Sequence, residues 1–291
     1  MSPQALTTKL MVVNEISLLR ERILESRREG KTIGVVPTMG ALHAGHLSLI
    51  ETARREVDEL VVTIFVNPTQ FGPTEDFRDY PRPLEVDLAA CQEMGVDVVF
   101  QPNVDQLYPA GFQSFVEVKG MSNVLEGAFR PTHFRGVTTI VLKLFNIVKP
   151  DIAYFGRKDY QQQLLIRRMC DDLNVPVEVR TCPTIREPDG LALSSRNVYL
   201  NEEERNSALL LSQCLQLAET MIAEGEVDLQ TVRSAMANCL GKANDVTLDY
   251  ATIVDALTLE ELDRPAKNMV ALVAARVGAT RLIDNIPVAS S

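Results

Sequence analysis

Residues 32–66 read TIGVVPTMGALHAGHLSLIETARREVDELVVTIFV, and this stretch decides the fold class. The apolar run 32–38 predicts a strand, and residues 46–59 carry apolar side chains at helical spacing. Residues 60–66 are apolar at nearly every position, which is typical of a strand covered on both faces. A strand, a turn, a helix and a second strand in this order predict a β-α-β unit of a parallel sheet.

The alternation of strands and helices continues to residue 182. Further strands are expected at 97–101, 152–155 and 175–181, and further helices at 84–94, 137–148 and 161–173. The sequence therefore predicts an α/β, Rossmann-like parallel sheet with helices on both faces. Ligands bind such sheets beyond the carboxyl ends of the strands, so we expect the functional residues to follow Val36, Val66, Phe155 and Thr181.

The pattern changes after about Cys182. Two amphipathic helices are expected at 202–222 and 228–242, and they are followed by strands at 247–254, 268–277 and 280–283, which we expect to be antiparallel. We therefore predict two domains. Residues 1–182 form the Rossmann-like domain, and residues 183–291 form a smaller C-terminal α+β domain.

Composition restricts the class of protein. The 291-residue chain has 29 Lys and Arg against 39 Asp and Glu, a net charge of −10 that argues against a nucleic-acid groove or a membrane-surface protein. The charge is uneven, because residues 130–168 carry eight basic and two acidic residues, a local balance of +6 that suits a small anionic ligand. No run of 18 apolar residues and no signal-peptide pattern is present, so a cytoplasmic protein is expected.

The five cysteines are scattered, and no CxxC pair is present. An odd, unpatterned count favours reduced thiols over a disulfide framework or a zinc site. Cys170 and Cys214 lie in apolar-periodic stretches and are expected in the core.

The segment PTMGALHAGH (37–46) follows the first predicted strand and opens a helix. Its glycines allow a tight turn, and the helix N-terminus is an anion site where His43 and His46 can donate to phosphate oxygens. The alternatives are a turn with a capping histidine, and a zinc site. Zinc would need a third ligand, and no HExxH motif or nearby cysteine supplies one.

Three other polar loops follow predicted strands. Asn67 and Gln70 offer amides to hydroxyls and carboxylates, and Lys158 and Asp159 offer a charge for phosphate and an acceptor for a ribose hydroxyl. A third loop supplies two hydroxyls and a guanidinium: Ser194, Ser195 and Arg196. Each loop alone is better explained as a polar turn or helix cap, but their joint placement at strand ends favours a site.

Two further segments are candidates for a role at this site. Residues 72–83 (GPTEDFRDYPRP) are polar and bounded by proline, so they form either a lid over the site or an ordinary surface loop. His133 precedes a helix, and a capping or packing role is favoured for it over a place in the pocket.

These segments resemble the pantothenate synthetase (pantoate–β-alanine ligase) family of the HxGH nucleotidyltransferase-like superfamily. The matching motifs are PTMGALHAGH (37–46), FVNPTQF (65–71), YPR (80–82), HFRGV (133–137), GRKDYQQ (156–162) and LALSSRN (191–197). The resemblance runs from about residue 10 to LIDN at 282–285 and keeps the family's order and spacing.

The resemblance implies an enzyme that joins pantoate to β-alanine and cleaves ATP to AMP and pyrophosphate in the presence of Mg²⁺. It implies a smaller C-terminal domain that closes over the ATP site, and a cytoplasmic homodimer. Pantoate is adenylylated first, and the amine of β-alanine then displaces AMP. Charge builds up on the α-phosphate and on the departing pyrophosphate, and the donors expected to stabilise it are His43, His46, Lys158, Ser194, Ser195 and Arg196.

Individual roles follow from the matching positions. His46 is the residue that the family identifies as catalytic, Gln70 and Gln162 would bind pantoate, and Gln70 would also serve β-alanine. Asp87 lies near the acidic position associated with Mg²⁺. The residues implied to contact ATP are Met39, Gly40, Ala41, Leu42, His43, Ala44, Gly45, His46, Gly156, Arg157, Lys158, Asp159, Ile185, Leu193, Ser194, Ser195 and Arg196.

Two other classes of protein stay open at this point. A related nucleotidyltransferase would adenylylate a phosphate ester and stop there, although the two glutamine amides suit a hydroxy acid better than a second phosphate group. A non-catalytic nucleotide-binding module would keep the fold without the chemistry.

Overall fold

The computed structural model describes residues 9–73 and 75–289, and the chain separates into two compact units. The first unit comprises Met1–Val118, Arg130–Gly156 and Leu165–Cys182, and the second comprises Lys119–Phe129, Arg157–Leu164 and Pro183–Ser291. Two short segments from the N-terminal part of the chain therefore cluster with the C-terminal residues.

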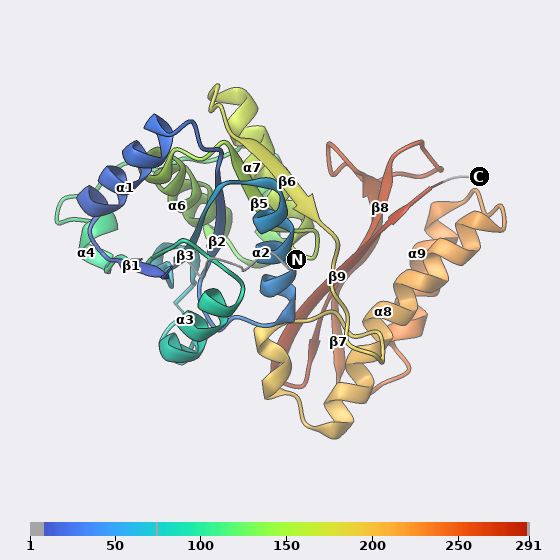
Figure 1. The fold of residues 1–291 in the computed structure, drawn as a ribbon. Coiled ribbons are helices and arrows are strands. Elements are labelled where there is room, and N and C mark those ends of the chain that lie inside the picture. The colour runs from blue at the N-terminus through green and yellow to red at the C-terminus, as the bar shows by residue number, and fades with distance from the viewer. Residues whose placement is uncertain (1–8, 74, 290–291) are drawn as a thin grey trace, which may run out of the picture. The chain divides into compact units, whose positions relative to one another are not determined.

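The first unit is built on a six-stranded sheet in the order β1-β4-β3-β2-β5-β6, in which every described pairing is parallel (Figure 1). Its strands are β1 (Met11–Val13), β2 (Ile33–Thr38), β3 (Glu59–Ile64), β4 (Val98–Phe100), β5 (Ile152–Gly156) and β6 (Glu178–Cys182). The chain leaves the neighbouring strands β2 and β5 in opposite directions across the sheet. Their carboxyl ends therefore form the switch point where ligands bind in open α/β sheets. The α/β fold class predicted from the sequence is confirmed.

The helices of this part of the chain are α1 (Ile16–Arg28), α2 (Ala44–Glu56), α3 (Leu84–Glu93), α4 (Val104–Leu107), α6 (His133–Val148) and α7 (Tyr160–Asp172), with a 3₁₀ turn η1 (Pro68–Gln70). The helices predicted from the periodicity are present as α2, α3, α6 and α7, and the structure adds α1 and α4. None of the helices in the described part of the chain is long and apolar enough to span a bilayer.

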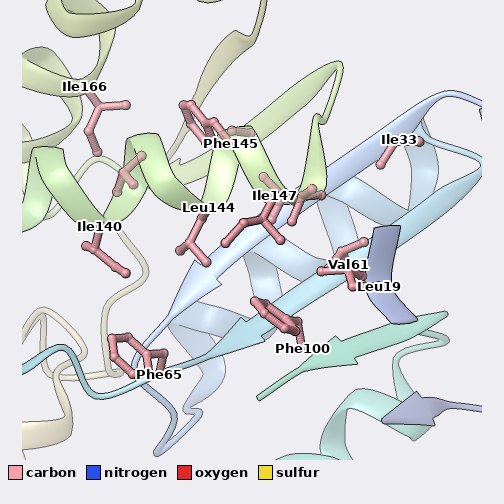
Figure 2. Close-up of a cluster of buried hydrophobic side chains, with 14 of the residues drawn as sticks. Leu19, Ile33, Val61, Phe65, Phe100, Ile140, Leu144, Phe145, Ile147 and Ile166 are labelled. Carbon is pink, nitrogen blue, oxygen red and sulfur yellow. The ribbon is translucent and has the colours of Figure 1, made fainter. Parts of the chain in front are cut away.

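The two faces of the sheet carry separate cores because successive side chains of a strand point to opposite faces. On β3, Val61 packs into the cluster that contains Leu19 of α1 and Leu144 of α6 (Figure 2). Its neighbour Val62 packs on the other face, in the cluster that contains Ile50 of α2. Each face of the parallel sheet is therefore covered by helices, which explains why residues 60–66 are apolar almost throughout.

The second unit is built on an antiparallel sheet in the order β7-β8-β9. Its main elements are η2 (Met121–Asn123), α5 (Glu126–Phe129), η3 (Ser195–Tyr199), α8 (Glu202–Ala223), α9 (Leu229–Leu240), β7 (Val246–Asp255), β8 (Met269–Val277) and β9 (Thr280–Val288). Side chains of α8 and α9 cover one face, and Leu125 and Leu164 pack on a separate cluster with Val270 and Leu272 of β8. The short segments 119–129 and 157–164 thus complete the second unit.

Several sequence predictions need correction in their bounds. Helix α2 begins at Ala44 and ends at Glu56, because β3 already begins at Glu59. Strand β9 continues to Val288 instead of ending at residue 283, and β1 and α1 were not predicted at all. The prediction of β9 stopped at Asp284 and Asn285 because both are polar, yet each is only 3% exposed.

The predicted core positions of Cys170 and Cys214 are confirmed. All five thiols are buried and outside any disulfide, with Cys170 and Cys214 in the two main cores. Burial raises the pKa of Cys170 to about 11, which keeps its thiol protonated at neutral pH.

Candidate active site

The turn after β2 brings His43 and His46 side by side at the N-terminus of α2. Their ring centroids are 4.2 Å apart. His43 caps the helix, because its Nδ1 accepts from the backbone N–H of Gly45 at 3.1 Å, and Nδ1 of His46 accepts from the backbone N–H of His43 at 3.4 Å. With both Nδ1 atoms accepting, each neutral ring carries its proton on Nε2, the donor it can offer to an anion.

The capping role that was the alternative for His43 is therefore present. Capping uses Nδ1 of His43 and places the proton of the neutral ring on Nε2. The positive end of the α2 dipole lies at the same place, which favours a negative charge there.

Asp87 of α3 holds the turn that carries these histidines. Its Oδ2 accepts from the backbone N–H of Ala41 and its Oδ1 from that of Leu42, both at 2.8 Å, and the residue is 2% exposed. Ala41 has a φ of +52° and Gly40 a φ of +81°, and a Cβ on Gly40 would lie 2.9 Å from Asp87 Oδ2. The carboxylate therefore stabilises a turn that the backbone alone disfavours.

The fit of Asp87 to a Mg²⁺ role can be tested on this geometry. Both carboxylate oxygens already accept a backbone N–H. Among residues 9–73 and 75–289, no group of three or more His, Cys, Asp or Glu side chains is placed to hold a metal ion. Mg²⁺ demands oxygen ligands in near-octahedral geometry, and this donor set does not fit a metal held mainly by the protein. The contacts argue for a structural role of Asp87.

Gln70 is fixed from three sides at the end of η1. Its Oε1 accepts from Asn67 Nδ2 at 3.1 Å, and its Nε2 lies 3.0 Å from Met39 Sδ. Its carbonyl accepts from Nδ1 of His133 at 2.8 Å. The structure thus brings Gln70, predicted to bind pantoate, into contact with Met39, predicted to bind ATP.

Asn67 departs from its expected role. The sequence predicted that its amide points into the ligand crevice, but the residue is 1% exposed. Its Nδ2 donates to Gln70 Oε1 and to the Gly136 carbonyl, and its Oδ1 accepts from the hydroxyl of Tyr108 at 2.8 Å. Asn67 therefore orients Gln70, and its amide is already used within the protein.

His133 and the expected lid are linked through Arg130. His133 Nδ1 donates to the Gln70 carbonyl, so its Nε2 accepts from Arg130 Nη1 at 3.2 Å. Arg130 in turn makes two hydrogen bonds of 2.7 Å with the carboxylate of Glu75. The packing role favoured for His133 is present. Through Arg130 and Glu75, His133 connects segment 72–83 to Gln70. Thr74 of this segment lies outside the described residues.

The second unit holds the other predicted ATP and pantoate residues, apart from Gly156, which closes β5 in the first unit. Arg157, Lys158 and Asp159 form the turn before α7, and Gln162 lies in the first turn of that helix. Its neighbour Gln161 donates through Nε2 to the carbonyls of Met121 and Val124 and accepts through Oε1 from the Glu126 N–H. Gln161 therefore anchors the start of α7 to segment 119–129.

The remaining predicted ATP residues lie on a second backbone segment of this unit. Ile185 and Leu193 are joined by a backbone hydrogen bond of 3.0 Å, and Ser194 caps η3 by accepting from the Arg196 N–H. Ser195 opens η3. The capping alternative considered for this loop is therefore realised by Ser194.

Several residues that organise the site were missed in the sequence. Asp284 of β9 contacts Arg186, 98 residues away along the chain, and Asn285 contacts Arg157, 128 residues away. Arg281 pairs with Glu126, 155 residues away, and the backbone N–H of Glu126 donates to Gln161. Sequence spacing carries no signal for such contacts. Asp284 and Asn285 lie at the end of the family resemblance, in LIDN at 282–285, and no role was assigned to them.

Comparison with known proteins agrees with the motifs. The family model described as pantoate-beta-alanine ligase matches residues 11–287. The chain is 52% identical over 275 residues to the pantothenate synthetase of Moorella thermoacetica, covering 94% of this chain and 97% of that protein.

Solved structures match as well. The pantothenate synthetase of Thermus thermophilus superposes with a TM-score of 0.91 at 45% identity, covering 95% of this chain and 98% of that one. The pantoate–β-alanine ligase of Francisella tularensis, complexed with β,γ-ATP and β-alanine, superposes with a TM-score of 0.79 at 35% identity, covering 96% and 97%.

Proposed function

The chain belongs to the pantoate–β-alanine ligase family, and from this premise we propose that it condenses pantoate with β-alanine and uses ATP to do so. The pantothenate synthetase of Moorella thermoacetica named above is 52% identical to this chain, and the match covers 97% of its length. One of the matching structures was solved with β,γ-ATP and β-alanine, which supports ATP and β-alanine as substrates of this chain.

We propose that the reaction proceeds through an acyl adenylate. A carboxylate is a poor acylating agent, since its leaving group would be oxide. Attack of a pantoate carboxylate oxygen on the α-phosphorus of ATP expels pyrophosphate and forms pantoyl adenylate. The leaving group on the acyl carbon is then AMP. The neutral amine of β-alanine then attacks the acyl carbon, expels AMP and loses one proton, which gives the amide.

The observation that carries this proposal is the pair of histidines at the N-terminus of α2. Both rings have their Nδ1 occupied by backbone N–H groups, so the proton of each neutral ring is on Nε2, a kind of donor that suits negative charge developing on the phosphates. We assign His46 and His43 to this role, together with Lys158, Ser194, Ser195 and Arg196. Gln70 and Gln162 are assigned to pantoate, and Gln70 also to β-alanine. Catalysis in this scheme comes from positioning and electrostatics.

Other parts of the proposal rest on the sequence and the family resemblance alone. These are the homodimer, the cytoplasmic location, the closure of domain 183–291 over the ATP site, and the use of Mg²⁺. When bound, Mg²⁺ would neutralise charge on the phosphates, but no step above is assigned to a metal held by this chain.

The test is a comparison of product release with and without β-alanine. With ATP, Mg²⁺ and pantoate alone, we expect about one pyrophosphate per active site, and continuous release of AMP only after β-alanine is added. His46→Ala should slow adenylate formation by about 10²–10³-fold, the usual loss for one donor to a developing oxyanion. Arg55→Ala, on the exposed part of the same helix, is the matched control.

The two alternative functions predict other outcomes. A transferase acting on a phosphate ester would not depend on pantoate and would not release AMP when β-alanine is added. A non-catalytic nucleotide-binding module would bind ATP without releasing pyrophosphate, and His46→Ala would leave the measurable activity of the protein unchanged.

A further inference from the structure

Two adjacent residues of β9 contact both predicted ATP-binding segments of the second unit. Asn285 donates through Nδ2 to the carbonyl of Lys158 at 2.8 Å and to that of Arg157 at 3.0 Å. The residue is 3% exposed, and β9 is a strand of the antiparallel sheet. The backbone of the turn that carries Lys158 is thereby tied to the sheet of its own unit.

The chemistry of this contact requires an amide. Two carbonyl oxygens converge on one side-chain atom, so that atom must be a donor with two hydrogens, which the Nδ2 of asparagine supplies. An aspartate in the same position would place an ionised oxygen against both carbonyls and could donate only when protonated. A side chain of the same shape therefore cannot replace Asn285 unless it also donates two hydrogen bonds.

Asp284 fixes the other segment. Its Oδ2 accepts from Arg186 Nη1 at 2.5 Å and its Oδ1 from Arg186 Nη2 at 3.0 Å, and Asp284 is also 3% exposed. Arg186 Nη1 also donates to the carbonyl of Gly190. Arg186 lies directly after Ile185, whose carbonyl accepts from the Leu193 N–H, so the pair ties the 185–193 segment to β9.

The two contacts are coupled through the backbone. The N–H of Asn285 donates to Asp284 Oδ1 at 2.7 Å, so the carboxylate that receives Arg186 also orients the residue that holds Lys158. A two-residue stretch of one strand thus sets the distance between the 157–158 turn and the 185–193 segment.

We propose that Asp284 and Asn285 are positioning residues for nucleotide binding, with Asn285 placing Lys158 and Asp284 placing Ile185 and Leu193. This inference rests on the proposed function, since it needs these segments to contact ATP. Neither residue touches the substrate in this proposal. They act through the backbone that carries the residues that do.

The test uses two opposite isosteric exchanges, Asn285→Asp and Asp284→Asn, with Ile283→Val on the same strand as the control. Hydrogen exchange read by peptide mass spectrometry reports placement without requiring activity. Asn285→Asp should accelerate exchange in residues 157–163, and Asp284→Asn should accelerate it in residues 185–193. Unchanged exchange in the segment assigned to each residue would overturn the positioning role.

Kinetics separate positioning from a purely structural role. For Asn285→Asp we expect a 10- to 100-fold loss in kcat/KM for ATP, with the KM for pantoate and the thermal midpoint close to those of Ile283→Val. The loss should shrink as the pH falls from 9 to 6, because the introduced carboxyl, crowded by two carbonyls, can donate once it is protonated. A loss that is equal for ATP and pantoate, or independent of pH, would contradict the proposal.

The failure of this proposal is distinguishable from failure of the function. If the wild-type protein releases no pantoate-dependent pyrophosphate, the proposed function is wrong. The exchange pattern still decides whether residues 284 and 285 place the two segments.

Discussion

The two units fix their predicted ATP-binding turns with side chains of opposite polarity. In the first unit, the carboxylate of Asp87 accepts from the N–H groups of Ala41 and Leu42. In the second, the amide of Asn285 donates to the carbonyls of Arg157 and Lys158. Both side chains are almost fully buried and have nearly the same shape. The difference shows that the backbone groups to be paired decide which side chain is needed: two N–H groups require a carboxylate, and two carbonyls require an amide. The shape of the side chain does not distinguish the two cases.

The predicted pantoate glutamines show a second contrast between the units. Gln70 is linked through His133 to the pair Arg130–Glu75, whose side chains are 16% and 24% exposed. Gln162 follows Gln161, which bonds to the backbone of Glu126, and Glu126 pairs with Arg281 at side-chain exposures of 9% and 14%. Each glutamine segment thus depends on an ion pair, and the pair in the second unit is the more buried. Removing it should have the larger effect.

The largest expected effect is that of Arg281→Met. Arg281 pairs with both Glu126 and Asp249, so the exchange leaves two buried carboxylates without their cation. Breaking a buried pair in this way destabilises a protein by about 3–5 kcal/mol. We expect a loss of that size in urea unfolding, with the second unit unfolding first.

Arg264→Met is the control, because Arg264 is exposed on the same unit. If Arg281→Met costs no more than this surface exchange, the buried pair does not hold segment 119–129, and the contrast between the two ion pairs is wrong.

The next effect in size is that of Asp87→Asn. The amide keeps one acceptor but turns an NH₂ group against one of the two backbone N–H donors. Hydrogen bonds to a charged group contribute about 1.5–3 kcal/mol, so adenylate formation should fall by roughly ten- to one-hundredfold. Pyrophosphate release with ATP and pantoate measures this loss, and Glu85→Gln, exposed in the first turn of α3, is the matched control.

A titration with Mg²⁺ decides between the two roles considered for Asp87. A positioning role predicts a lower maximal rate at an unchanged half-saturating Mg²⁺ concentration. A clear rise in that concentration for Asp87→Asn alone would restore the metal-ligand prediction.

The sequence predicted the parallel sheet because all of its strands except β1 leave a local signal. Runs such as 60–66 are apolar throughout, and the helices beside them repeat at 3.6 residues, so neither requires knowledge of the rest of the chain. The turn with His43 and His46 was predicted for the same reason, since its glycines, histidines and helix start lie within ten residues.

Residues that act across the chain could not be predicted in this way. Asn285 lies 127 residues from Lys158, and its polar side chain, with that of Asp284, ended the strand prediction early. Asn67 was assigned to the ligand crevice because nothing local shows that Tyr108 and Gly136 already use its amide. Buried polar contacts depend on the tertiary arrangement, and they are the part of this site that the sequence concealed.

The smallest expected effect is that of Glu75→Gln in the first unit. Burial raises the pKa of Glu75, but the hydrogen bond and charge of Arg130 outweigh it, so the pKa lies below its ordinary value. The ion pair therefore stabilises the fold above the pKa of the unfolded chain, and this contribution disappears as the pH falls through the lower folded-state value. Because the pair is partly exposed, we expect a loss of less than about 1 kcal/mol at pH 7.

The free energy of unfolding of wild type and Glu75→Gln, measured from pH 7 down to pH 3, tests this expectation. The two curves should converge at the acidic end, where the wild-type carboxyl is also protonated. Glu51→Gln, which removes an exposed helical ion pair, should show almost no difference at either pH. A constant gap between wild type and Glu75→Gln would mean that packing, and not the charge on Glu75, holds segment 72–83 to Arg130, and the contrast between the two units would then be one of burial alone.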